Sequence, residues 1–126
     1  MKANLMLAEA ATVHPDGTIS LLRAWINNMT GPTAPYEFRG AFAVRILAES
    51  GDIGPHTFDL RGIDQDGTEI MPTLQGDFEV AKGGGATMFV LGMHFGFKTV
   101  GNYEFILRVD RVQLALWPLK VEQVQS

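Results

Sequence analysis

Residues 101–110 of the chain read Gly-Asn-Tyr-Glu-Phe-Ile-Leu-Arg-Val-Asp, and this stretch is the clearest sign of the fold. Its apolar residues are spaced two apart, at Tyr103, Phe105, Leu107 and Val109. This alternation predicts a β-strand with one buried face and one face in water. The register is well determined, because a shift by one residue would expose every apolar side chain of the buried face.

Tyr103 stands at the start of this strand, two residues after Gly101, as in the tyrosine corner of immunoglobulin-like sandwiches. In that corner, the tyrosine hydroxyl bonds to the backbone of the preceding loop. An ordinary buried tyrosine at a strand start is the alternative interpretation. Both interpretations predict a sandwich, with Phe105 where an antibody domain has a cysteine.

Turn residues recur at short intervals along the rest of the chain, and no segment between them carries a sustained helical stripe of apolar residues. A first strand is expected almost at Met1 and a short return strand after Gly67. The other segments expected to form strands are Ile19–Ile26, Ala41–Glu49, Thr57–Gly62, Gln75–Val80, Thr87–Phe95, Tyr103–Asp110 and Val112–Val121. The sequence therefore predicts a single all-β domain over residues 1–126, an antiparallel β-sandwich of about eight or nine strands. An immunoglobulin-like topology is expected, with a jelly roll as the alternative.

Two of these strands have unusual features. Thr87–Phe95 is apolar on both faces, which predicts a central strand or one whose outer face meets a partner or an overlying loop. Pro118 interrupts the last strand and cannot donate to a ladder, so that strand is expected at an edge or bulged there. A long loop is expected from Asn27 to Pro35.

Composition excludes several classes of function. The chain has 126 residues, 10 basic against 14 acidic, for a net charge of −4, which argues against nucleic acid as a partner. No apolar run is long enough to span a membrane, and without cysteine there is no disulfide or thiolate chemistry. Glu9 interrupts the apolar start, so we expect no signal peptide and a cytoplasmic protein, with the sequon at Asn28 an accident of a loop.

The residues that could carry chemistry lack the spacing that chemistry needs. His14, His56 and His94 have no second ligand at metal-binding spacing. Asp64-x-Asp66-Gly67-x-Glu69 and Gly83-Gly84-Gly85 are interpreted as a hairpin turn and a flexible hairpin loop rather than a calcium loop and a phosphate cradle. The Gly-x-Ser-x-Gly element of many hydrolases is also missing. We therefore expect no enzyme, no cofactor, and no catalytic, cofactor-binding or metal-ligating residue.

The two tryptophans have two possible roles. Trp25 and Trp117 are expected in the core, with an anchor in a partner surface as the alternative. Tyr36 is the one clear aromatic residue expected in a loop, which gives little support to a carbohydrate-binding surface.

Five short motifs carry a resemblance to a known family. Residues 1–13 read Met-Lys-x-x-Leu-x-Leu-Ala-Glu-x-Ala-x-Val, and Asp-Gly follows at residues 16–17. His-Thr-Phe at residues 56–58 leads to Asp-Gln-Asp-Gly at residues 64–67, and the stretch over residues 101–110 completes the pattern. Over nearly its whole length the chain resembles an uncharacterised family of small bacterial β-sandwich proteins, although it departs from that pattern at Lys82–Gly85. The resemblance implies a fold and no chemistry.

Three classes of function stay open. The first is a non-catalytic binding or adaptor module that works through a sheet face, a loop or a free sheet edge. The second is a structural virion protein, a phage head-decoration or tail component, that acts by symmetric assembly. The third is a small-molecule or carbohydrate-binding sandwich. A protein partner or self-association is expected in the first two, and neither nucleic acid nor a membrane in any of them.

Overall fold

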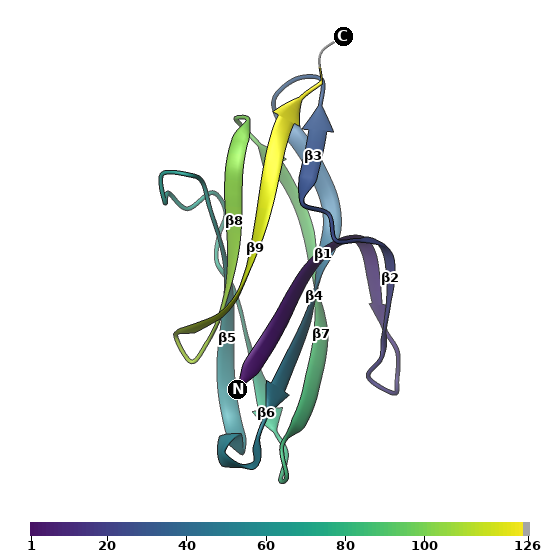
Figure 1. The fold of residues 1–126 in the computed structure, drawn as a ribbon, viewed down its shortest axis with the longest axis vertical. Helices are drawn as coiled ribbons and strands as arrows, with labels where there is room; N and C mark the ends of the chain where they lie inside the picture. Colours follow the sequence, from purple (N-terminus) through teal and green to yellow (C-terminus); the bar gives the residue numbers. More distant parts are fainter. Residues whose placement is uncertain (125–126) are drawn as a thin grey trace.

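The computed structural model describes residues 1–124, and two β-sheets pack face to face across one apolar core (Figure 1). The first sheet, sheet A, has the strand order β2-β1-β4-β7, and the second, sheet B, has the order β3-β9-β8-β5-β6. The strands are β1 (Lys2–Val13), β2 (Ile19–Ala24), β3 (Asn28–Gly31), β4 (Tyr36–Ala48), β5 (Gly54–Ile63), β6 (Leu74–Val80), β7 (Gly85–Phe97), β8 (Gly101–Val109) and β9 (Val112–Gln123). A short 3-10 helix, η1 (Ser50–Asp52), lies between β4 and β5.

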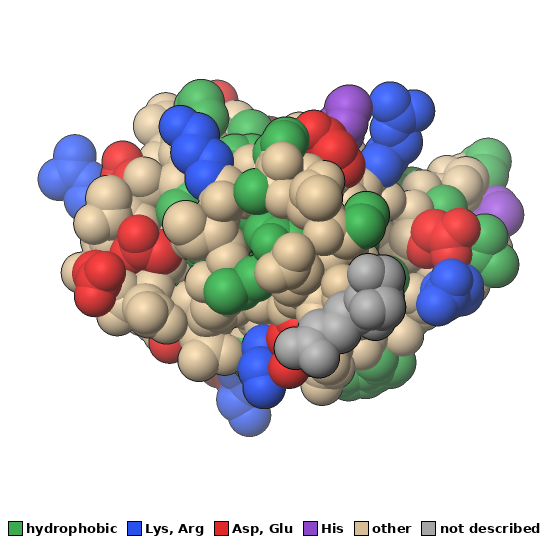
Figure 2. All heavy atoms as spheres, turned by 90° about the horizontal axis from the view of Figure 1, so that it is seen from above, with side chains coloured by type: hydrophobic (Ala, Val, Ile, Leu, Met, Phe, Trp, Pro, Cys, Tyr) green, Lys and Arg blue, Asp and Glu red, His purple; other side chains and the backbone are tan. Residues whose placement is uncertain are grey.

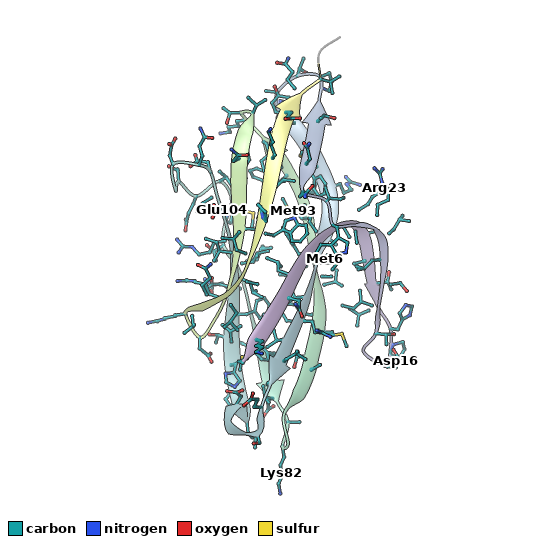
Figure 3. All side chains as sticks on the ribbon, viewed as in Figure 1. Met6, Asp16, Arg23, Lys82, Met93 and Glu104 are labelled. Carbon is teal, nitrogen blue, oxygen red and sulfur yellow. The ribbon has the colours of Figure 1, made fainter. Side chains whose placement is uncertain are left out.

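Sheet A is antiparallel throughout, and the two halves of β1 pair with different strands. Residues 2–8 of β1 pair with β4, and residues 8–13 pair with β2. The hairpin over residues 9–24, which we call the arm, bends away from the body of the sandwich (Figure 1). Figure 3 shows Asp16 near the tip of the arm and Arg23 near its base.

Sheet B contains the one departure from antiparallel pairing among the described strands. β3 runs parallel to β9, with Met29 opposite Val121. The loop expected from Asn27 to Pro35 thus contains a strand, and the prediction of a purely antiparallel sandwich is wrong at this edge. Four residues of mixed polarity give too weak an alternation to be recognised, and their partner lies at the other end of the chain.

Residues of the expected strands meet in the core, together with Phe97, which lies two residues beyond the expected end of its strand at Phe95. Phe42 from β4, Phe97 from β7 and Phe105 from β8 are each fully buried. The rings of Phe42 and Phe105 lie 4.9 Å apart, so they bridge the two sheets. Each large apolar side chain buried in this way contributes about 1.5–3 kcal/mol.

The tyrosine corner predicted at Tyr103 is present. Its ring is buried, and its hydroxyl donates a hydrogen bond of 2.6 Å to the carbonyl oxygen of Thr99 in the loop between β7 and β8. Gly101 has a φ of 142°, a conformation that favours glycine. The corner therefore fixes the place where the chain crosses from sheet A to sheet B.

Two turns differ from expectation. The return strand expected after Gly67 is only an isolated bridge between Ile63 and Glu69. The glycine loop at Gly83–Gly85 does not close a hairpin, because β6 belongs to sheet B and β7 to sheet A. Strand order, which the local sequence does not encode, decides between these two kinds of connection.

Pro118 lies where a missing N–H is tolerated. The N–H of Lys120 in β9 donates to the carbonyl of Asn27, on the side of β9 that faces β3. Residues two apart in a strand face the same edge, so the nitrogen of Pro118 also points away from β8. The expectation that this strand lies at an edge near Pro118 is confirmed, since β3 pairs only with residues 120–123.

Candidate functional site

The last strand of sheet A has a long unpaired edge. β7 pairs with β4 along its whole length, from Gly85 opposite Ala48 to Phe97 opposite Tyr36. No described strand pairs with its other side. β6 is likewise the last strand of sheet B and pairs only with β5. The two sheets thus end side by side in strands that each lack a neighbour.

Hydrogen bonding identifies the backbone groups that face this unpaired side. The N–H of Ile26 donates to the carbonyl of Leu7 at 3.0 Å, so the backbone of Leu7 faces β2 and not β4. Leu7 opposes Phe42, and Phe42 opposes Leu91. Since neighbouring residues of a strand face opposite edges, Phe42 faces β7 and Leu91 faces β4. Gly92, next to Leu91, therefore points its N–H and C=O away from the sheet.

The same alternation assigns the other outward-facing groups of β7. Met88, Val90 and His94 share the phase of Gly92, and we call the backbone groups of these four residues the β7 edge. Strand β7 contains no Lys, Arg, Asp, Glu or Pro. Natural edge strands usually carry such residues to prevent pairing with other chains. The β7 edge therefore has no charge or proline that would oppose an added strand.

The side chains beside the β7 edge are only partly covered. Phe89, Leu91 and Phe95 point between the sheets and pack against the core, yet each remains partly exposed. Phe89 lies 4.5 Å from Phe58 of β5, measured between ring centroids. Phe78 of β6 is also partly buried. The unpaired side of the sandwich thus presents aromatic and aliphatic surface together with unpaired backbone groups.

The sequence prediction for this segment is corrected in part. The strand over Thr87–Phe95 is an edge strand and not a central one, so its apolar composition does not come from burial between two neighbours. Met88 and Val90 on its outer face are partly exposed. The alternative that this strand meets a partner stays open.

The three histidines lie apart from one another. His14 bonds to Ser20 in the arm, and His94 lies 3.1 Å from Glu37 on the exposed outer face of sheet A. His56 lies at the start of β5. No group of three or more His, Cys, Asp or Glu side chains that could hold a metal ion occurs among residues 1–124.

His56 joins three segments at one end of the molecule. Its Nδ1 bonds to Asp110 and its Nε2 to the carbonyl of Asp52, both at 2.5 Å. Asp110 also accepts a hydrogen bond from the N–H of Thr57. The hydrogen bond to Asp110 is the main cause that raises the pKa of His56, and the same bond lowers the pKa of Asp110. We call these hydrogen bonds around His56 and Asp110 the clasp, and they give the histidine of the His-Thr-Phe motif a structural role.

The carboxylates and the glycine loop are part of turns. Asp64 Oδ1 accepts hydrogen bonds from the N–H groups of Asp66 and Thr68, each at 2.9 Å, and Gly67 has a φ of 81°. The turn predicted here is confirmed. Gly83 and Gly84 also adopt positive φ angles, as a tight connection requires.

The aromatic residues divide differently from expectation. Trp117 is buried, as predicted, and its Nε1–H donates to the carbonyl of Ile26 at 2.7 Å. Trp25 is 67% exposed, so the prediction of a core position is wrong for this residue. Tyr36 begins β4 and is buried, so it is not a loop aromatic.

Comparison with known proteins identifies the family. A family model matches residues 4–122, almost the entire described chain, and its description is a family of unknown function, DUF6941. The chain belongs to this family. No curated protein matches it at a significant level.

Charged side chains of both signs are interspersed on the face of the DUF6941 protein shown in Figure 2, with hydrophobic side chains between them. Such a distribution produces no strong field of one sign over that face. Among the described residues, no helix is long and apolar enough to cross a lipid bilayer.

Sequence reasoning missed the β7 edge, although part of its signal was present. Thirteen residues without a charge or a proline are visible in the sequence of Gly85–Phe97. That pattern predicts either a central strand or an unprotected edge strand, and only the strand order separates the two.

Proposed function

We propose that this DUF6941 protein is a non-catalytic binding module that accepts an extended polypeptide segment as an additional β-strand along the β7 edge. The observation that carries the proposal is the combination of unpaired backbone groups and partly exposed apolar side chains along a strand without charged residues. An added strand would pair with the outward N–H and C=O groups, and its alternate side chains would cover Phe89 and Leu91.

The chemistry of the partner follows from this geometry. Backbone pairing gives affinity without sequence preference, so the side chains that point between the sheets must supply specificity. Those side chains would meet Phe58, Phe78 and Phe89, which favours aliphatic or aromatic residues at every second position of the segment. We infer an extended partner segment that alternates apolar and polar residues.

We also infer that the scaffold is an immunoglobulin-like sandwich and not a jelly roll. Two observations support this inference. The hydrogen bond from Tyr103 to Thr99 is the tyrosine corner of that fold. The order β9-β8-β5, with β4 beside β7 in the other sheet, matches the central strands of its two sheets.

A pair of variants at Gly92 tests the proposed strand addition. A Cβ added at Gly92 meets no atom within 4 Å, and its φ lies outside the left-handed region. Gly92→Pro removes one outward N–H without removing a hydrogen bond to β4. Gly92→Ala is the matched control, because it adds a side chain and keeps the N–H.

The experiment selects binders from a phage-displayed library of random peptides on the immobilised wild-type protein. We expect peptides with alternating apolar residues that bind wild type and Gly92→Ala alike and lose about tenfold or more in affinity for Gly92→Pro, since one buried backbone pair is lost. Amide exchange gives a second measurement: Val90 and Gly92 should exchange quickly when free and slowly when bound. Equal binding to both variants, or no slowing at these amides, would contradict the proposal.

A structural role by self-assembly is the second candidate, and one observation favours it. Sheet A leaves both of its outer strands, β2 and β7, with one unpaired edge, so the edge of one copy could pair with the other edge of the next. Light scattering over a concentration series distinguishes the two candidates. A defined oligomer that dissociates in Gly92→Pro and persists in Gly92→Ala would support assembly, as expected for a structural virion protein. A monomer at every concentration would contradict it.

A further inference from the structure

A second surface, on the outer face of sheet A, has the features of a small-molecule site and reaches the β7 edge only at Met88. A groove of about 750 Å³ lies between the arm, the first half of β1, the outer face of sheet A and β9. Most of its lining is apolar, and the apolar side chains used below are Met6, Ile19, Leu21 and Trp25. Figure 3 places Met6 on β1 beside the arm. This volume lies within the usual range of ligand pockets, about 300–1,000 Å³.

Trp25 lines this groove with its backbone in a strained conformation. Its φ is 67°, in the left-handed region, where a residue other than glycine is strained by about 1–3 kcal/mol. Its ring centroid lies 5.6 Å from that of Trp117, which is itself held by the hydrogen bond to Ile26. The strained backbone thus presents a large apolar ring to solvent at one end of the groove, while Trp117 supports it from the core.

Arg45 is the one charged residue among the described residues that line the groove. Its Nε donates to the side-chain oxygen of Asn4 at 3.1 Å, which orients the guanidinium. Arg45 forms no ion pair with any residue in the described part of the chain. Its terminal N–H groups are therefore open to an anion, and a carboxylate matches their geometry.

The positions of Arg45 and Trp25 along β1 set the length of an occupant. Arg45 lies opposite Asn4, and Trp25 precedes Ile26, which bonds to Leu7. Three residues of β1 separate these points, which corresponds to about 10 Å. A molecule that reaches both needs an apolar body of about this length with an anionic group at one end.

We propose that the groove binds a free amphiphilic carboxylate, a medium-chain fatty acid or a molecule of the same chemistry. The carboxylate pairs with Arg45. The apolar chain runs along Met6, Ile19 and Leu21 and ends against Trp25. Charge complementarity at one end and the exposed indole at the other select this class over an uncharged or a cationic amphiphile.

The two tryptophans provide the readout, because Trp25 and Trp117 are the only ones in the chain and both line the groove. The probes are decanoate, decanol and decyltrimethylammonium, which share one tail and differ in head group, each kept below its micelle concentration. We expect a saturable change of tryptophan fluorescence, with decanoate binding at least about tenfold more tightly than the other two, as a charge-assisted pair implies.

Variants separate the groove from unspecific binding. Arg45→Gln should lower the affinity for decanoate to that for decanol, and Trp25→Ala should weaken all three probes while Trp117 reports. Arg39→Gln is the matched control, because Arg39 is exposed on the same strand and face but does not line the groove. Circular dichroism verifies that each variant is folded.

Three results would overturn the proposal. They are equal affinity for the three head groups, an equal loss in Arg39→Gln and Arg45→Gln, or no saturable change with decanoate. Displacement of decanoate by the peptides selected on the β7 edge would assign the groove to a polypeptide instead. The first three results leave strand addition at β7 untouched, because Gly92→Pro tests it separately.

Discussion

Strand β8 and the arm both carry large apolar side chains, yet these lie in opposite environments. In β8, every second side chain from Tyr103 to Val109 is buried. In the arm, Leu21 is 40% exposed and Leu22 58% exposed, although they lie on opposite faces of β2. Alternation therefore tells which side chains share a face, and only the packing of other elements decides whether that face is covered.

Removal of a core ring from β8 should cause the largest loss of unfolding free energy. Phe105→Ala should lower the free energy of unfolding by about 3–5 kcal/mol, because a fully buried ring is replaced by a cavity between the sheets. Urea unfolding measures the loss, and Phe105→Leu, which keeps most of the volume, should lose much less. A loss below about 1 kcal/mol in Phe105→Ala would mean that the ring is not packed as described.

Loss of the hydrogen bond in the tyrosine corner should have the next largest effect on the free energy of unfolding. Tyr103→Phe removes the hydroxyl that donates to Thr99 and should cost about 1–2 kcal/mol. The control is Tyr36→Phe, since the hydroxyl of Tyr36 makes no hydrogen bond to another described residue. Equal losses of unfolding free energy in the two variants would show that the corner hydrogen bond is not the cause.

The clasp at His56 should make stability depend on pH. The pKa of His56 is raised above its ordinary value of 6.5, so its contribution is complete below pH 6.5 and is lost as the pH rises through the raised pKa. The pKa of Asp110 is lowered from 3.8, so its contribution is present above pH 3.8 and is lost as the pH falls through the lowered value. This pair should thus contribute most to the free energy of unfolding between pH 3.8 and pH 6.5.

Chemical unfolding at a series of pH values measures this dependence. The change should stay below about 1 kcal/mol, because Asp110 is half exposed and solvent screens the pair. His56→Gln should flatten the decline above pH 6.5, whereas His14→Gln, in the arm, should leave it unchanged. An identical pH profile in wild type and His56→Gln would exclude the clasp as its origin.

The smallest effect is expected in the arm. Leu22→Ala should change the free energy of unfolding by no more than about 0.5 kcal/mol, because the side chain is already mostly in water. Urea unfolding beside Phe105→Ala gives the direct contrast. A loss above about 1.5 kcal/mol would mean that the arm is covered in solution, as it would be by a second copy.

The sequence predicts those features whose cause is local. Tyr103 and its corner could be predicted because the glycine, the tyrosine and the alternation lie within ten residues. The turn at Asp64 could be predicted because Asp and Gly favour that conformation wherever they occur together.

Features that depend on distant packing could not be predicted. The exposure of Trp25 depends on how far the arm bends from the body, and β3 depends on a partner at residues 120–123. The β7 edge depends on strand order, in which β7 is the last strand of its sheet. Residue patterns specify faces, whereas edges arise only when all strands have found their neighbours.

The parallel pair of β3 and β9 has a consequence for how the chain folds as it is synthesised. Synthesis delivers Met29 well before its partner Val121, so β3 cannot pair until β9 has been made. Until then, the residues of β3 and β8 that pair with β9 have no partner. Contacts between residues this far apart in sequence slow folding, because the long intervening chain must be ordered before they can form.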